Sequence, residues 1–369
     1  MGTGTLALPY ASERGGLAFN AFGLFAIGAW DYHIPVGLTV LDALMLSLFI
    51  GLVVAYEAAM SSFVSGTSLT TGSSGLDLLL PNTIVIALSC APDVGWLGNF
   101  SGIGLLALAM SFVIISWRGF AENGFVGFSD SPWSSLGLWP ESISDASSWF
   151  GVAVFSYGVA PFVFNFRDSM NDPRCVGSAV RTGLLLVYVG YIIMSNGIRI
   201  LFSPSHVFDG DVLQAMPNSG ISMYVRLLMT FVVVLTTPLV VVPCGELIEG
   251  KLGMVDADDS GDGGGGGQRQ RRRSLAPKRI LVRVVICLSC IAFSVNVPNG
   301  FVNLVSFIGC FCGATTGFVL PPLFRLKLST GGKCWPECLC DVGALVLAVV
   351  ATSITSALTF RELIGKVAR

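Results

Sequence analysis

Long apolar runs without charged residues, separated by short polar segments, make up most of this chain. Each run has at least 17 residues, and a helix that crosses a bilayer needs about 20 apolar residues, with a range of about 17 to 25. The run at 284–324 is long enough for two spans, which divide at 296–300. The other uncharged runs are 58–76, 94–117, 146–166, 182–198, 227–245 and 342–360. Membrane β-barrels show alternating segments of about ten residues instead, so the pattern predicts an all-α bundle.

The first hundred residues follow the pattern less regularly. Residues 15–40 are interpreted as one span with a polar interruption at 30–33, and residues 44–64 as another that carries Glu57. Residues 81–92 form a short apolar segment that is expected to join the next span through a tight turn. The expected total is about eleven helices, of which the first is truncated at its N-terminal end.

Composition supports a polytopic membrane protein. The 369 residues are 53% hydrophobic and 12% charged, with a mean hydropathy of +0.75, whereas a soluble domain carries about 25% charged residues. The net charge of −2 excludes nucleic-acid binding through a basic field. The expected environment is therefore a lipid bilayer around an integral, multi-pass protein, and composition leaves a vacuolar, a lysosomal and a plasma membrane open.

Lysine and arginine alternate between connections, which predicts the orientation of the spans. The connection at 246–283 has eight basic residues, whereas the one at 203–220 has none. The basic side is assigned to the cytosol, although the basic C-terminal tail opposes this assignment for the last helix. Residues 1–369 are expected to form a single transmembrane domain, within which 250–279 is a flexible cytosolic loop rich in Gly and Arg.

Motifs for catalysis or for a metal centre are missing from the sequence. Three of the ten cysteines form a cluster, Cys334, Cys338 and Cys340, but zinc needs a fourth ligand and both histidines, His33 and His206, are remote. Palmitoylation or an inert cluster at a helix start is the favoured interpretation, with zinc as the alternative. We expect no enzymatic activity, no cofactor and no metal.

Two interrupted spans carry a stronger signal. The first opens with Gly2, Thr3, Gly4 and Thr5, and a half-helix that begins inside a bilayer presents free N–H groups suited to a substrate carboxylate. Small residues that let helices pack closely are the alternative explanation. In the second span, Gly158 and Pro161 interrupt 146–166 near its middle.

Residues beside this second break offer oxygen atoms. They are Phe155, Ser156, Tyr157 and Gly158. A pair of interrupted spans is the sequence pointer to a transporter built from inverted repeats, with its binding site near the bilayer midplane. A third segment, Thr236-Thr237-Pro238, lies inside 227–245. Its proline frees carbonyls that a threonine or a cation can use, and a structural kink alone explains it equally well.

Taken in order, these segments resemble the amino acid/auxin permease family of transmembrane amino acid transporters. The segment Gly2 to Ala11 resembles its first helix, Gly151 to Met170 its sixth, Leu235 to Pro238 its eighth and Asn303 to Leu323 its tenth. The resemblance implies a LeuT-type fold of eleven helices, with two inverted five-helix repeats and breaks in helices 1 and 6. It also implies secondary active transport of amino acids.

The resemblance also shapes the expected substrate and coupling ion. Neither broken segment has a charged side chain at the break, so neutral amino acids are expected. Proton coupling is favoured over sodium coupling, although Gly158-Val159-Ala160 stands where proton-coupled members have a Glu-Gly-His-like run. Glu57 is a candidate proton carrier because an ionisable residue at membrane depth is costly, and Thr236 or Thr237 matches the sodium-binding position. A non-transporting nutrient sensor on the same scaffold is the alternative function.

Overall fold

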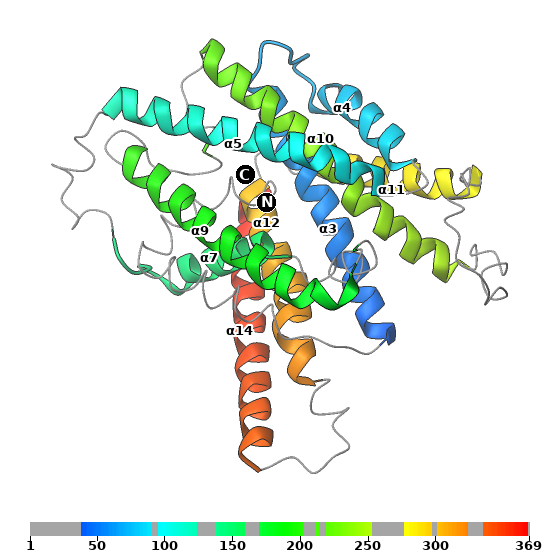
Figure 1. Cartoon of the computed structure of the whole chain (residues 1–369), viewed down its shortest axis with the longest axis vertical. Coiled ribbons are helices and arrows are strands. Elements are labelled where there is room, and N and C mark those ends of the chain that lie inside the picture. The colour runs from blue at the N-terminus through cyan, green and yellow to red at the C-terminus, as the bar shows by residue number, and fades with distance from the viewer. Residues whose placement is uncertain are drawn as a thin grey trace.

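The computed structural model describes residues 38–90, 95–123, 137–158, 170, 172–202, 212–213, 219–252, 277–296, 301–323 and 335–367. Within these ranges the chain forms nine α-helices and no strands (Figure 1). The helices are α3 (Leu38–Ser65), α4 (Ser74–Ser89), α5 (Gly95–Asn123), α7 (Ile143–Ser156), α9 (Val176–Phe202), α10 (Gly220–Lys251), α11 (Pro277–Val295), α12 (Phe301–Ile308) and α14 (Trp335–Val367). Two π-helical segments, η4 (Gly309–Gly313) and η5 (Thr315–Val319), continue α12.

Most helices cover the uncharged runs of the sequence. The run at 58–76 is the exception, because α3 ends at Ser65 and α4 begins at Ser74, so this run holds the end of one helix, a turn and the start of the next. Six apolar stretches in the described part are long enough to cross a membrane: Asp42–Ser65, Gly102–Ala121, Val176–Phe202, Gly220–Lys251, Phe301–Leu323 and Asp341–Gly365. The predicted division of 284–324 is confirmed, because α11 ends at Val295 and α12 begins at Phe301. These helices confirm an all-α membrane protein. The spans expected before residue 38 lie outside the described residues, so the total of eleven stays a prediction.

One predicted boundary is wrong. The short segment expected to begin at Pro81 is a helix that starts seven residues earlier, at Ser74, and holds Pro81 in its interior. The first turn is fixed from outside the helix, because the Asp77 carboxylate accepts hydrogen bonds from the Thr70 hydroxyl and the Thr71 backbone N–H, both at 2.6 Å. These contacts position the start of α4, so Pro81 does not have to begin it.

Contacts at the helix ends show that α3 and α10 run antiparallel along their full length. At one end, the Lys251 ammonium lies 3.5 Å from the Asp42 carboxylate. At the other end, the Arg226 guanidinium packs directly on Gly66, where an added Cβ would lie 1.8 Å from Nη1. The two contacts therefore fix the register of α3 and α10 across the whole span.

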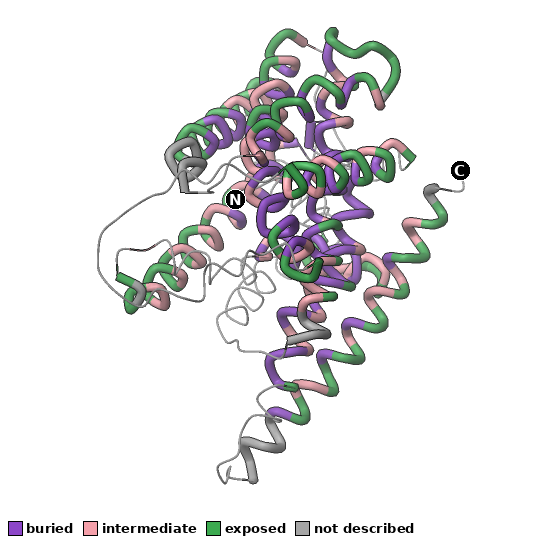
Figure 2. The backbone as a smooth tube through the Cα atoms, turned by 90° about the vertical axis from the view of Figure 1, so that its right-hand side faces the viewer, coloured by how far each residue is buried: buried purple, intermediate pink, exposed green. Residues whose placement is uncertain are grey.

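Around this pair, α4, α5 and α11 also pack on α10, and α4 and α11 pack on α3 as well. Figure 2 shows that buried residues gather in the middle of the molecule. Helix α10 remains continuous through Pro238 and Pro243, because packing on several sides compensates for the N–H groups that prolines lack.

Helix α7 is held by α12, η4 and α14. An added Cβ on Gly309 would lie 1.8 Å from the Gly151 carbonyl oxygen, so the two backbones touch. The Ser306 hydroxyl donates to the Ser148 carbonyl at 3.0 Å across the same crossing. On α14, the Glu362 carboxylate accepts hydrogen bonds from the hydroxyls of Ser144 and Ser148. The first turns of α7 are therefore fixed from two sides.

Helix α14 lies at the edge of the molecule and extends away from the other helices (Figure 1). Much of its length is exposed in Figure 2. Large apolar side chains such as Val346, Leu347 and Ile354 are about half exposed or more. Such a surface fits contact with lipid, which solvates apolar side chains as well as a protein interior does.

Candidate functional site

Helix α7 ends at the position where the sequence predicts an interruption of the run 146–166. Helix α7 begins with a Ser142 cap, whose hydroxyl accepts from the Asp145 backbone N–H, and it ends at Ser156. Tyr157 is the C-terminal cap, and the Gly158 N–H donates to the Phe155 carbonyl at 3.1 Å. A helix of 14 residues is too short to cross a bilayer, and the buried Phe155 and Tyr157 place its C-terminal end inside the protein.

Helix α9 supplies the partner for this end. The Tyr191 hydroxyl donates to the Ser156 carbonyl oxygen at 2.8 Å. The rings of Tyr157 and Tyr191 meet edge to face, with their centroids 5.3 Å apart and their planes at 68°, which is a favourable arrangement for two aromatic rings. Both tyrosines are buried. The end of α7 is thus attached to α9 by one hydrogen bond and one aromatic pair.

A cavity of about 300 Å³ opens at this junction. It is lined by Ser156 and Tyr157 at the end of α7, by Met170, and by Val176, Ala179, Val180, Gly183, Leu184, Val187 and Tyr191 on α9. None of these side chains is charged. The C-terminal end of a helix carries a partial negative charge from its unpaired carbonyls, so this cavity presents a negative dipole end in an otherwise apolar chamber.

The predicted substrate residues are only partly brought together here. Ser156 and Tyr157 line the cavity, whereas Phe155 and Gly158 are next to it in the chain without lining it. The Ser156 hydroxyl donates to the Val152 carbonyl at 2.7 Å, so it is bound to its own helix. The first-helix residues Gly2, Thr3, Gly4 and Thr5 lie outside the described residues, and their role stays a prediction.

The candidate coupling residues lie on other helices and do not line this cavity. Glu57 on α3 is fully buried, and its Oε2 accepts a hydrogen bond of 2.6 Å from Nδ2 of Asn82 on α4. On α10, the Thr237 hydroxyl donates to the Val233 carbonyl at 2.7 Å, and the Thr236 hydroxyl bonds the carbonyls of the same turn. The threonine hydroxyls are therefore bound to carbonyls of their own helix in the turn before Pro238, and their role in ion binding stays a prediction.

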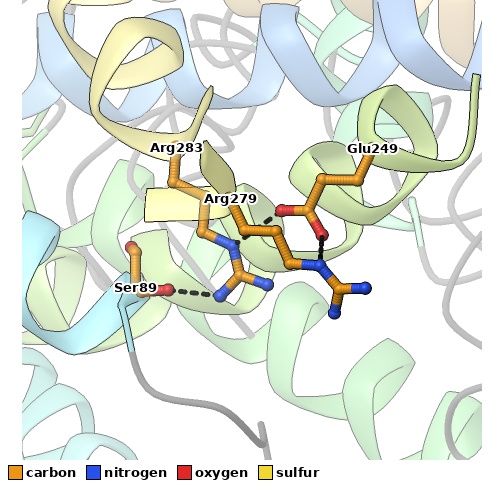
Figure 3. Close-up of polar contacts among 4 residues, drawn as sticks. All are labelled: Ser89, Glu249, Arg279 and Arg283. Atoms are coloured by element: carbon orange, nitrogen blue, oxygen red, sulfur yellow. Dashed lines mark hydrogen bonds and ion pairs between the residues drawn. The ribbon is translucent and has the colours of Figure 1, made fainter. Parts of the chain in front are cut away.

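A second polar cluster joins α4, α10 and α11 (Figure 3). The Arg283 side chain is 3% exposed, and its Nε is 3.4 Å from Oε1 of Glu249. Its Nη1 donates a hydrogen bond of 2.5 Å to the Ser89 carbonyl. Arg279 lies 3.7 Å from the other oxygen of Glu249. A buried charge is tolerated when it is paired and hydrogen-bonded, so this cluster fixes the ends of three helices at the face of the protein that also holds Asp42 and Lys251.

Sequence reasoning missed two residues of these sites. Asn82 was hidden in the apolar segment 81–92, although a polar amide at membrane depth is a signal in itself. Tyr191 lies in the run 182–198 and looks like an ordinary membrane-facing aromatic residue. Among the described residues, no three His, Cys, Asp or Glu side chains are grouped as metal ligands. The cysteine cluster at 334–340 lies outside the described side chains.

Comparisons with known proteins agree with the geometry. A family model described as "Transmembrane amino acid transporter protein" matches residues 38–361. The chain is also similar to a sodium-coupled neutral amino acid symporter 2 from Danio rerio, with 22% identity over 361 residues. That alignment covers 88% of this chain and 66% of the relative, so the chain spans slightly less than two thirds of the relative's length.

Proposed function

Because the chain belongs to the transmembrane amino acid transporter family, we propose that it is a secondary active transporter of neutral amino acids, with the substrate bound where α7 ends. One observation carries the choice of substrate. Among the residues that the structure describes, those that line the cavity at that end include no acidic or basic side chain. A charged substrate side chain would lose its hydration there without gaining a partner, which is costly in an apolar site.

The zwitterionic part of the substrate is assigned to the end of α7 and to the segment Gly2 to Thr5. The ammonium group is attracted to the C-terminal end of α7, where the carbonyls of the last turn include that of Ser156, and to the partial negative charge of the helix. The carboxylate is assigned to the N–H groups of Gly2, Thr3 and Gly4. An apolar substrate side chain then packs on the valines and leucine of α9, which line the cavity.

The coupling ion is proposed to be the proton, with sodium as the alternative. Sodium is supported by the name of the Danio rerio relative and by the position of Thr236 and Thr237 near the middle of α10. Against it, both threonine hydroxyls already donate to helix carbonyls, and only their remaining lone pairs could face a cation.

The test fills the cavity without disturbing the fold. Gly183 lines the cavity, and an added Cβ there meets no atom within 4 Å. We expect Gly183→Leu to lower alanine and leucine counterflow in proteoliposomes at least tenfold, because the new side chain occupies the space of the substrate. Gly197→Leu on the same helix, where a Cβ also has open space, should retain counterflow.

Two results would refute the proposal. One is transport of lysine or glutamate in preference to alanine and leucine by the wild-type protein. The other is a Gly183→Leu protein that performs counterflow as fast as Gly197→Leu, which would place the substrate elsewhere.

A further inference from the structure

Glu57 is buried between three helices and does not line the cavity. It is eight residues from the end of α3 at Ser65, or about 12 Å along the helix axis, and its side chain is fully buried. Asn82 is eight residues from the start of α4. Helix α11 packs on both α3 and α4, and its Cys287 and Cys290 are buried. The carboxyl group is therefore enclosed by α3, α4 and α11.

Two oxygen atoms of the pair have no hydrogen-bond partner. Glu57 Oε2 accepts from Asn82, but Glu57 Oε1 and Asn82 Oδ1 are both buried without a donor within the described part of the chain. Buried acceptors are nearly always satisfied. A carboxylate held by a single amide bond in an apolar interior is also expensive. The Glu57–Asn82 pair therefore lacks a hydrogen-bond donor or a cation that would satisfy these oxygen atoms.

Other charges are too far along the helices to supply it. On α3 and on the described elements that pack against it, the charged side chains other than Glu57 sit near the helix ends, and the remaining titratable groups are thiols and two tyrosines. The charged groups are Asp42, Asp77, Arg226, Glu246, Glu249, Lys251, Lys278, Arg279 and Arg283; the others are the thiols of Cys244, Cys287, Cys290, Cys310 and Cys312 and the hydroxyls of Tyr56 and Tyr224. Thiols are poor ligands for a hard cation, which prefers oxygen. The surroundings thus suit a proton better than sodium.

We propose that Glu57, held by Asn82, is the proton-binding site that couples substrate transport to a proton gradient. In each transport cycle one proton binds the carboxylate from the water on one side and leaves to the water on the other. The inference rests on the proposed transport function and places the coupling site on α3 and α4, separate from the substrate cavity at the end of α7.

The experiment separates coupling from transport. Wild-type protein and Glu57→Gln are reconstituted, and alanine counterflow without any gradient is measured beside alanine accumulation driven by a pH gradient. Glutamine has the size of glutamate and can still accept from Asn82. We expect counterflow within twofold of wild type, accumulation at least tenfold lower and a flat pH profile. Glu141→Gln, which neutralises an exposed acid, should keep both activities.

A second variant decides the matter even if Glu57→Gln does not fold. Asn82→Leu removes the donor that favours the charged carboxylate, so the pH midpoint of alanine accumulation should move to higher pH by at least half a unit. A purely structural role for Asn82 would lower activity at every pH without moving the midpoint.

Several outcomes would overturn the inference. They are accumulation retained in Glu57→Gln, a pH midpoint unmoved in Asn82→Leu, or wild-type accumulation that follows a sodium gradient and ignores a pH gradient. A wild-type protein with no alanine counterflow would instead refute the proposed function. The two failures are thus distinguishable.

Discussion

The crossing of α7 and α12 can be tested by adding one methyl group. Gly309 contacts Gly151 so closely that a Cβ on Gly309 would lie 1.8 Å from the Gly151 carbonyl oxygen. Carbon and oxygen atoms in close packing are about 3.3–3.6 Å apart. The Gly309→Ala substitution must therefore push the helices apart by about 1.5 Å, and the obstacle is backbone rather than a flexible side chain.

The cost can be estimated from its parts. Overpacking of a close contact costs about 1–3 kcal/mol, and loss of the hydrogen bond from Ser306 to Ser148 adds about 1 kcal/mol. The higher helix propensity of alanine offsets at most about 1 kcal/mol of this destabilisation. We expect a net destabilisation of about 1–3 kcal/mol, seen as a lower midpoint of thermal unfolding in detergent.

The matched control is Gly197→Ala, because a Cβ at Gly197 meets nothing within 4 Å. It gains the helix propensity without the collision, so its unfolding midpoint should equal or exceed that of wild type. Gly151→Ala enters the same contact, 2.0 Å from the Ser306 carbonyl, and its effect should not add to that of Gly309→Ala. Gly309→Ala unfolding at or above the wild-type midpoint would refute the argument.

Two further predictions concern the polar contacts. Arg283→Ala should lower the free energy of unfolding by about 3–5 kcal/mol, because the buried Glu249 carboxylate loses its ion pair with Arg283. Its control is Lys251→Ala, which should cost less than about 1 kcal/mol because the ion pair of Lys251 with Asp42 is partly exposed. Equal losses of unfolding free energy for the two variants in denaturant unfolding would contradict this prediction. Tyr191→Phe removes the hydrogen bond that attaches the Ser156 carbonyl at the end of α7 to α9. Because the substrate cavity lies at this junction, the KM for alanine should rise about fivefold, equivalent to about 1 kcal/mol. The exposed Tyr224→Phe is its control, and an unchanged KM would count against the role of this hydrogen bond.

Helix positions were predictable because the bilayer constrains them directly. A charged side chain inside hydrocarbon is costly, so the uncharged runs locate spans such as α9 and α10 without knowledge of their neighbours. The end of α7 was also predictable, because Gly158 weakens a helix and Pro161 cannot continue one. The start of α4 was not, since it depends on how Asp77 meets a preceding turn.

Pairings between helices were not predictable from the sequence. Glu57 and Asn82 are 25 residues apart and on different helices, and hydrophobic periodicity does not tell which helices become neighbours. Tyr191 likewise reaches Ser156 over 35 residues. Glu57 could be selected as an acid at membrane depth, but its enclosure by Asn82 and the thiols of α11 became visible only in the folded chain.

The substrate cavity and the Glu57 pair are on separate helices, so coupling between them requires a physical connection. Helix α12 and its π-helical continuation supply one. Gly309 touches Gly151 on α7, and the neighbouring Ile308 packs on Gly51 of α3, where an added Cβ would lie 3.0 Å from it. Gly51 is six residues, or about 9 Å, from Glu57 along α3. Closely packed contacts of this kind shift between discrete arrangements rather than deform gradually. A displacement of α7 on substrate binding that keeps its contact with Gly309 would therefore have to move α12, and this movement would alter the packing of Ile308 on the helix that carries Glu57.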